Sequence, residues 1–194
     1  MLNGASFSVG NAAEARSQGV EVDGRWRAAP WLTLTGALAW LDAKYTDYAN
    51  APCPARPAAT PYPSCALSGT VLVQNLTGHD LIFAPEWKGS FGAEVEFDVG
   101  ESMVFGGRLS TDFTSSFYMV ADNDPLDRQD GYAKVDLRLS LADAGGRWEV
   151  ALAGRNLTDE TTSNVGNDIP AVTGAHYRSY ESPRSLVVQL RVQY

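Results

Sequence analysis

The sequence predicts an all-β protein in which seven or eight strands form an antiparallel up-and-down meander. Apolar and polar residues alternate with a period of two in seven segments, which is typical of strands with two unlike faces. Tight turns and long polar loops alternate between these segments, as expected for a meander. We find no segment with the 3.6-residue periodicity of an amphipathic helix, so we expect no helix.

The first predicted strand covers residues 19–27, where two valines and a tryptophan face one side and charged residues face the other. Residues 32–41 follow, with leucines and a tryptophan opposite threonines and alanines. Residues 87–98 set aromatic, alanine and valine side chains against lysine, serine and glutamate. Each segment therefore has an apolar face and a polar face.

Four further segments continue the alternation. They are residues 102–118, 133–141, 148–156 and the terminal stretch 184–194. Residues 4–10 supply a candidate eighth strand.

The connections differ in length according to the end of the meander. Tight turns with Pro or Gly lie at 28–30, 99–101 and 143–146, whereas long polar loops occupy 46–82, 119–131 and 160–180. Short and long connections alternate, so every long loop lies at the same end. This asymmetry is typical of outer-membrane barrels.

Composition excludes several classes of protein. With 44% hydrophobic and 20% charged residues, the 194-residue chain is not disordered and suits a single domain. A formal net charge of −8 argues against a nucleic-acid partner. The sequence contains no apolar run long enough for a membrane-spanning helix, and residues 1–10 lack the features of a secretory signal. Composition alone would fit a soluble protein.

Aromatic placement favours a membrane barrel with its apolar face toward lipid. Ten residues separate Trp87 from Phe97. That distance is about 33 Å of strand, or about 23 Å of height at a tilt of about 45°, close to the apolar band of such barrels. The predicted aromatic girdle consists of Trp26, Trp40, Trp87, Phe97, Phe105, Phe113, Phe117 and Trp148.

The terminal strand keeps its alternation to the last residue, which is aromatic. It resembles the recognition strand that the barrel-assembly machinery reads in outer-membrane proteins. By that resemblance, the assembly signal comprises Val188, Leu190, Val192 and Tyr194.

Several short segments follow one another along the chain in a characteristic order. The most specific are "FAPEW" at 83–87 and "GRNLTDE" at 154–160, and the others lie at 11–27, 32–48, 130–141 and 182–194. In this order they resemble the C-terminal part of the barrel of a TonB-dependent outer-membrane receptor.

This resemblance implies that residues 1–194 are the C-terminal segment of such a barrel, with the plug domain and the N-terminal strands absent. It implies the bacterial outer membrane as location and nutrient uptake as function, with a ferric siderophore, cobalamin or a saccharide as substrate. The implied partners are outer-membrane lipid and the barrel-assembly machinery and, in the full-length parent, a plug domain and TonB. Charged residues of the polar face would then line the lumen, among them Glu21, Arg25, Glu94, Arg108, Asp112, Lys134, Asp136, Arg138, Arg155 and Arg191.

The two cysteines lie in one long loop that is rich in proline. An even number of cysteines in an exported loop predicts a disulfide between Cys53 and Cys65. A zinc site at this pair is not expected, because no histidine lies nearby.

Residues 122–130 bring Asp122, Asp124, Asp127 and Asp130 into one loop. Calcium is a candidate ligand, but the EF-hand pattern fails, so we expect a solvated acidic loop and no metal site. His79 and His176 are expected to be ordinary loop residues.

No nucleophile elbow, phosphate-binding glycine loop or zinc-spaced histidine pair is present in the sequence, so we expect no enzyme and no cofactor. Two other hypotheses stay open. One is a self-contained eight-stranded outer-membrane barrel with a structural or adhesion role, and the other is a soluble ligand-binding barrel.

Overall fold

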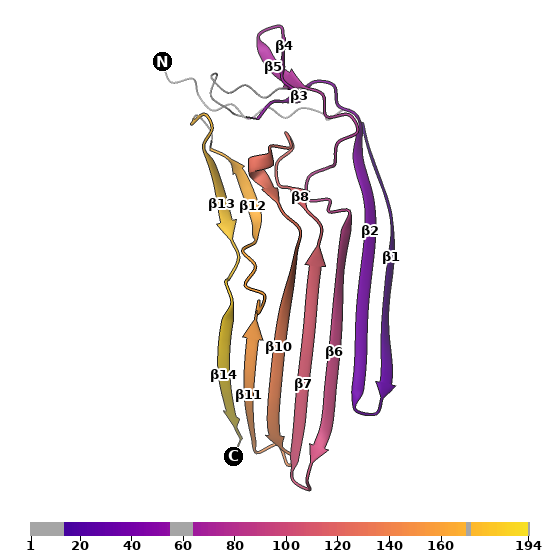
Figure 1. Ribbon diagram of the computed structural model, residues 1–194, viewed down its shortest axis with the longest axis vertical. Helices are drawn as coiled ribbons and strands as arrows, with labels where there is room; N and C mark the ends of the chain where they lie inside the picture. The colour runs from indigo at the N-terminus through magenta and orange to yellow at the C-terminus, as the bar shows by residue number, and fades with distance from the viewer. Residues whose placement is uncertain (1–13, 55–63, 170–171, 194) are drawn as a thin grey trace.

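A computed structural model describes residues 14–54, 64–169 and 172–193. Its main element is one seven-stranded antiparallel sheet, in which each long strand pairs with the next along the chain (Figure 1). The strands are β1 (Glu14–Ala29), β2 (Leu32–Asp47), β6 (Trp87–Val99), β7 (Met103–Thr114), β10 (Tyr132–Asp143), β11 (Trp148–Arg155) and β14 (Ser185–Val192). The predicted meander is confirmed. The candidate eighth strand, residues 4–10, lies outside the described residues.

The strands differ in length. β1 and β2 each have 16 residues, whereas β11 and β14 have 8. A tilted strand of about 9–11 residues crosses a bilayer, so β1 and β2 are longer than a crossing requires. Their surplus length lies at the long-loop end, at the top of Figure 1.

The opposite end carries the tight turns. Gly100 and Gly146 adopt φ of 67° and 77°, a left-handed conformation that glycine reaches without the steric cost of a side chain. In the turn after β10, the Arg147 guanidinium donates to Asp143 through Nε at 2.9 Å and Nη2 at 2.7 Å. These contacts hold successive strands in a fixed register.

The long connections contain structure that alternation did not predict. The first holds a small sheet of β3 (Ala51–Pro52), β4 (Ala66–Ser68) and β5 (Val71–Gln74). The second pairs β8 (Phe117–Tyr118) with β9 (Arg128–Gln129) around a short 3-10 helix, η1 (Pro125–Asp127). The last forms a hairpin of β12 (Ser163–Asp168) and β13 (His176–Tyr180).

One predicted strand boundary is wrong. The segment 102–118 was expected to be a single strand carrying both Phe113 and Phe117, but β7 ends at Thr114. The chain turns there because Ser115 caps the ladder: its N–H donates to the Trp87 carbonyl, and its Oγ accepts from the Trp87 N–H. Phe117 lies in β8, and its ring contacts Phe83 at a centroid distance of 6.0 Å.

Two neighbouring strands approach closely at Gly89. Register pairs Gly89 with Phe113, whose ring lies over the glycine. A Cβ at Gly89 would meet the ring at 2.6 Å and the Ala37 carbonyl oxygen at 2.8 Å. An aromatic ring over a strand glycine is a known way to fix register.

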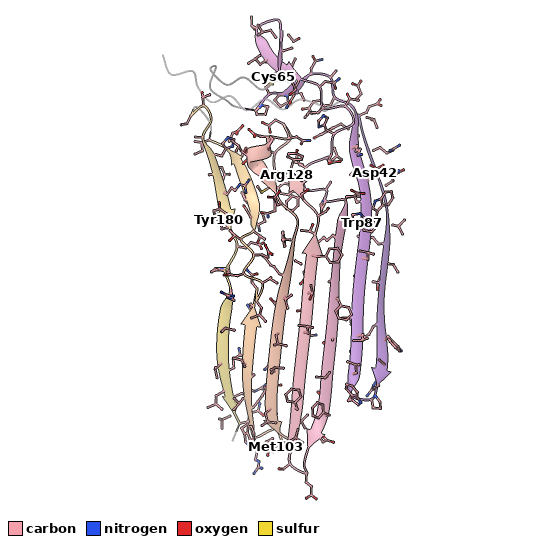
Figure 2. All side chains as sticks on the ribbon, viewed as in Figure 1. Asp42, Cys65, Trp87, Met103, Arg128 and Tyr180 are labelled. Atoms are coloured by element: carbon pink, nitrogen blue, oxygen red, sulfur yellow. A yellow bond between two sulfur atoms is a disulfide. The ribbon has the colours of Figure 1, made fainter. Side chains whose placement is uncertain are left out.

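The apolar face of the sheet stays exposed in the described part of the chain. Val20 is 65% exposed and Val188 is 73% exposed (Figure 2 shows side chains projecting from the strands). The compact hydrophobic cluster lies instead where the long-loop end of β2 meets the first long connection, and contains Tyr45, Ala51 and Leu76. A soluble barrel must bury its apolar face, so this arrangement argues against that hypothesis.

Candidate functional site

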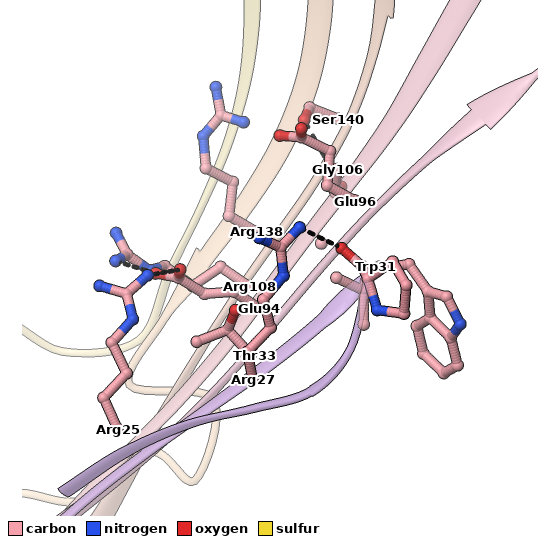
Figure 3. A pocket seen from close by; sticks show the side chains of 13 residues that line it. Arg25, Arg27, Trp31, Thr33, Glu94, Glu96, Gly106, Arg108, Arg138 and Ser140 are labelled. Atoms are coloured by element: carbon pink, nitrogen blue, oxygen red, sulfur yellow. Dashed lines mark hydrogen bonds and ion pairs between the residues drawn. The ribbon is translucent and has the colours of Figure 1, made fainter.

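The polar face aligns charged side chains across neighbouring strands. Register places Thr33, Glu94, Arg108 and Arg138 in one row over β2, β6, β7 and β10. Glu94 accepts a hydrogen bond from Arg108 and forms an ion pair with Arg25 at 3.7 Å (Figure 3). Four of the predicted lumen residues therefore lie close together.

This row lines a hollow of about 720 Å³ near the tight-turn end of the sheet. Its charged lining residues are Arg25, Arg27, Arg108, Arg138, Glu94 and Glu96. Four arginines against two glutamates leave the hollow positive, although the chain as a whole is acidic. Arg138 also bonds to Glu149 at 2.8 Å, so the guanidinium is held in place. We call this region the arginine hollow.

A second group of ionisable side chains lies at the opposite, long-loop end. One oxygen each from Asp124, Asp127 and Asp168 and one nitrogen from His176 lie within 4.8 Å of one another. Nδ1 of His176 is 2.8 Å from Oδ2 of Asp127 and 3.0 Å from Oδ1 of Asp168. We call these four residues the Asp–His cluster.

Local sequence explains how η1 supplies two of these carboxylates. Asp124 is the N-cap of η1, and its Oδ1 accepts from the Leu126 N–H at 2.8 Å. Pro125 follows at the first helical position, where a missing N–H costs nothing. Three residues per turn then place Asp127 on the same side as Asp124.

Gly166 lets β12 approach this helix. A Cβ at Gly166 would meet Oδ1 of Asp127 at 3.1 Å and Cε of Met119 at 2.6 Å. The next residues of the hairpin bring Asp168 opposite His176 by register. The cluster therefore depends on a glycine that alternation alone does not mark as important.

The prediction of a solvated acidic loop is wrong for most of residues 122–130. Asp124 and Asp127 are 0% exposed, and Asp122 is also buried, whereas the Asp130 side chain is 87% exposed. Burial raises the pKa of Asp122 to about 6; a hydrogen bond from the Asp124 N–H opposes the shift, and the neighbouring carboxylates add to it.

His176 is likewise no ordinary loop residue, because its side chain is only 13% exposed and lies among carboxylates. The reason is that the β12–β13 hairpin covers the loop. The Ser163 N–H donates to Gln129 at 2.8 Å, and Arg178 donates to the Arg128 carbonyl at 2.9 Å. His79, by contrast, contributes backbone bonds to Tyr45 and Leu76.

The loop between β2 and β6 joins the same assembly. Gln74 donates to the Asp122 carbonyl at 2.6 Å, and Asn123 donates to the Asp80 carbonyl at 3.2 Å. Three loops far apart in sequence therefore support one another. The predicted disulfide between Cys53 and Cys65 is present in the first of them, with a Cα–Cα distance of 6.1 Å.

Other predicted site residues lie on the apolar face of the sheet. Trp26, Trp87, Phe97 and Phe113 are exposed there, and so are Val188, Leu190 and Val192 of the terminal strand. Tyr194 lies outside the described residues. The girdle and the assembly signal stay predictions.

An antiparallel meander with an exposed apolar face, tight turns at one end and long loops at the other has the architecture of a transmembrane β-barrel wall. The family model "TonB dependent receptor-like, beta-barrel" matches residues 1–157. The chain belongs to this family. Within the described residues, helices long and apolar enough to cross a membrane are absent.

Solved structures show the same fold. The ferric yersiniabactin uptake receptor FyuA from Yersinia pestis matches with a TM-score of 0.68 and 16% identity, over 95% of this chain and 24% of that receptor. The siderophore receptor PiuA from Acinetobacter baumannii matches with a TM-score of 0.62 and 12% identity, over 93% of this chain and 22% of that receptor. The chain thus spans about a quarter of these receptors' length. No curated protein matches its sequence significantly.

Proposed function

We propose that this chain forms part of the barrel wall of a bacterial outer-membrane receptor that imports ferric siderophores with energy from TonB. The observation that carries the proposal is the pairing of an exposed apolar face with a polar face that carries the positively charged arginine hollow, in a chain of this family. In the proposal, the apolar face meets lipid and the arginine hollow lines the lumen.

The arginine hollow supports a role in passage or in plug contact. A concave surface lined by one sign of charge attracts ligands of the opposite sign and raises their association rate. Guanidinium groups also bind carboxylates in a bidentate way, whether on a plug domain or on a chelate. The ion pairs of Glu94 and Glu149 hold Arg25, Arg108 and Arg138 in position for such contacts.

Two solved receptors of the same fold support the substrate class, since one is described as a ferric yersiniabactin uptake receptor and the other as a siderophore receptor. Cobalamin and saccharides are the competing classes within this proposal. Assembly would require the terminal strand, with Val188, Leu190, Val192 and Tyr194 read by the barrel-assembly machinery and the girdle residues placed at the lipid interfaces.

Uptake by the full gene product that contains this sequence tests the proposal. We expect iron-starved cells carrying it to accumulate labelled iron from a panel of siderophores only when TonB is present. Replacing Arg25, Arg108 and Arg138 together by Gln should lower the uptake rate about tenfold, because the attractive charge is lost.

The matched control replaces three basic residues outside the hollow, Arg16, Lys44 and Arg184, by Gln, and should leave uptake close to the wild-type rate. Equal uptake by both triple variants would contradict the role of the hollow. Import of cobalamin or a saccharide in place of iron chelates would contradict the substrate class.

A further inference from the structure

We propose that Asp124, Asp127, Asp168 and His176 bind a divalent transition-metal cation that fastens the β12–β13 hairpin to the loop between β7 and β10. The site lies in the long loops, away from the arginine hollow, and the proposal does not depend on which nutrient the receptor imports.

The four ligand atoms come from separate elements that the fold holds together. η1 and its N-cap supply Asp127 and Asp124, and the hairpin supplies Asp168 and His176 as register partners. All four atoms lie within 4.8 Å of one another. Opposite ligands of an ion with bonds of about 2.0–2.2 Å lie about 4 Å apart, so small side-chain movements would complete a coordination shell.

Two buried atoms in the cluster point to a missing ligand. Oδ1 of Asp127 and Nε2 of His176 make no hydrogen bond with the described residues, and Asp127 is completely buried. A buried carboxylate oxygen without a partner is costly, because it loses its water and gains nothing in exchange. A bound cation would satisfy this oxygen and the histidine nitrogen together.

Charge leads to the same conclusion. Nδ1 of His176 lies within 3.0 Å of oxygens from both Asp127 and Asp168, yet one N–H can donate fully to only one of them. A divalent cation bound among the carboxylates would lower the electrostatic repulsion between them.

The mixed donor set selects the class of ion. Calcium and magnesium take oxygen ligands, whereas imidazole suits zinc, copper, nickel and iron. Three carboxylates and one imidazole therefore favour a divalent transition metal, for which zinc is the practical probe. Because Asp124 and Asp127 are 0% exposed, the site admits a bare ion and excludes an iron chelate.

Calorimetry on the full gene product in detergent, after treatment with a chelator, tests this site with Zn²⁺, Mn²⁺ and Ca²⁺. We expect about one equivalent of Zn²⁺ to bind, and Ca²⁺ to bind far more weakly. Loss of a residue that only hydrogen-bonds to a metal ligand weakens metal sites by about 10–100-fold. Asp127→Asn and His176→Gln each remove a proposed ligand, so each should weaken Zn²⁺ binding by about 100-fold or more.

Asp130→Asn is the matched control, because Asp130 belongs to the same loop but lies outside the cluster with its side chain 87% exposed. It should bind Zn²⁺ as the wild type does. Heat-modifiable migration on gels checks that every variant keeps its barrel.

Hydrogen exchange gives a second readout. Zn²⁺ should slow exchange across residues 163–180 in the wild type and in Asp130→Asn, but not in Asp127→Asn. The proposal is overturned if Zn²⁺ does not bind, if both cluster variants bind it normally, or if Ca²⁺ binds in preference.

Discussion

Replacing Leu109 by arginine lowers the free energy of unfolding in lipid by about 2–4 kcal/mol, which is the cost of a charged side chain on the lipid face at the bilayer midplane. Leu109 lies at the centre of β7, on the apolar face, with Ala93 and Leu137 as its register partners. Urea unfolding of the full gene product in lipid vesicles measures the change.

Ser110→Arg is the control, because Ser110 is adjacent in sequence but faces the polar side. Its register partner on β10 is Asp136, which can pair with the new charge. We expect this variant to unfold within about 1 kcal/mol of the wild type, as lumen substitutions have little effect on insertion. Equal destabilisation of both variants, or tolerance of Leu109→Arg, would show that the apolar face does not meet lipid.

Removing the disulfide should lower the free energy of local unfolding of the first long loop by about 3 kcal/mol, which is the chain-entropy value for closing a loop of this length. Cys53 follows β3 and Cys65 precedes β4, so the bond ties together the two outer strands of the small sheet. In Cys53→Ser with Cys65→Ser, we expect exchange of the β3–β5 amides to accelerate about 100-fold. Hydrogen exchange with mass spectrometry follows these segments separately.

Reductant on the wild type should reproduce this acceleration and should add nothing in the double variant. The amides of β6, β7 and β10 should exchange at unchanged rates, because the small sheet does not pair with them. Loss of protection throughout the large sheet would mean that the disulfide supports the barrel itself.

The long strands were predictable because their signal is local. A period of two is visible in any eight residues, and each strand of the large sheet pairs with its sequence neighbour in the meander. The same signal predicted too long a strand at Phe117, because the alternation continues past Thr114. The strand pairing ends there, since Ser115 bonds to Trp87. A side chain that caps a neighbouring strand leaves no periodic trace.

The Asp–His cluster was not predictable in the same way. Asp127 and His176 are 49 positions apart, and the hairpin that joins them is held by side-chain bonds such as that from the Ser163 N–H to Gln129. The sequence showed four aspartates in the loop 122–130 and one histidine in each of two other long loops. It did not show that Asp127 is buried and Asp130 exposed, or that His176 is mostly buried and His79 exposed. The D-P-L-D pattern of η1, an N-cap followed by proline, was the signal available for the two carboxylates.

Spin labels at successive positions of β7 test most directly whether the apolar face meets lipid and the polar face meets water. Labels attached to single cysteines at Phe105 through Asp112, in the full gene product in liposomes, report collisions with oxygen from the bilayer and with a water-soluble nickel complex. We predict a two-residue period, with Leu109 accessible to oxygen and Arg108 and Ser110 accessible to nickel. The opposite phase, or nickel access at every position, would contradict the account.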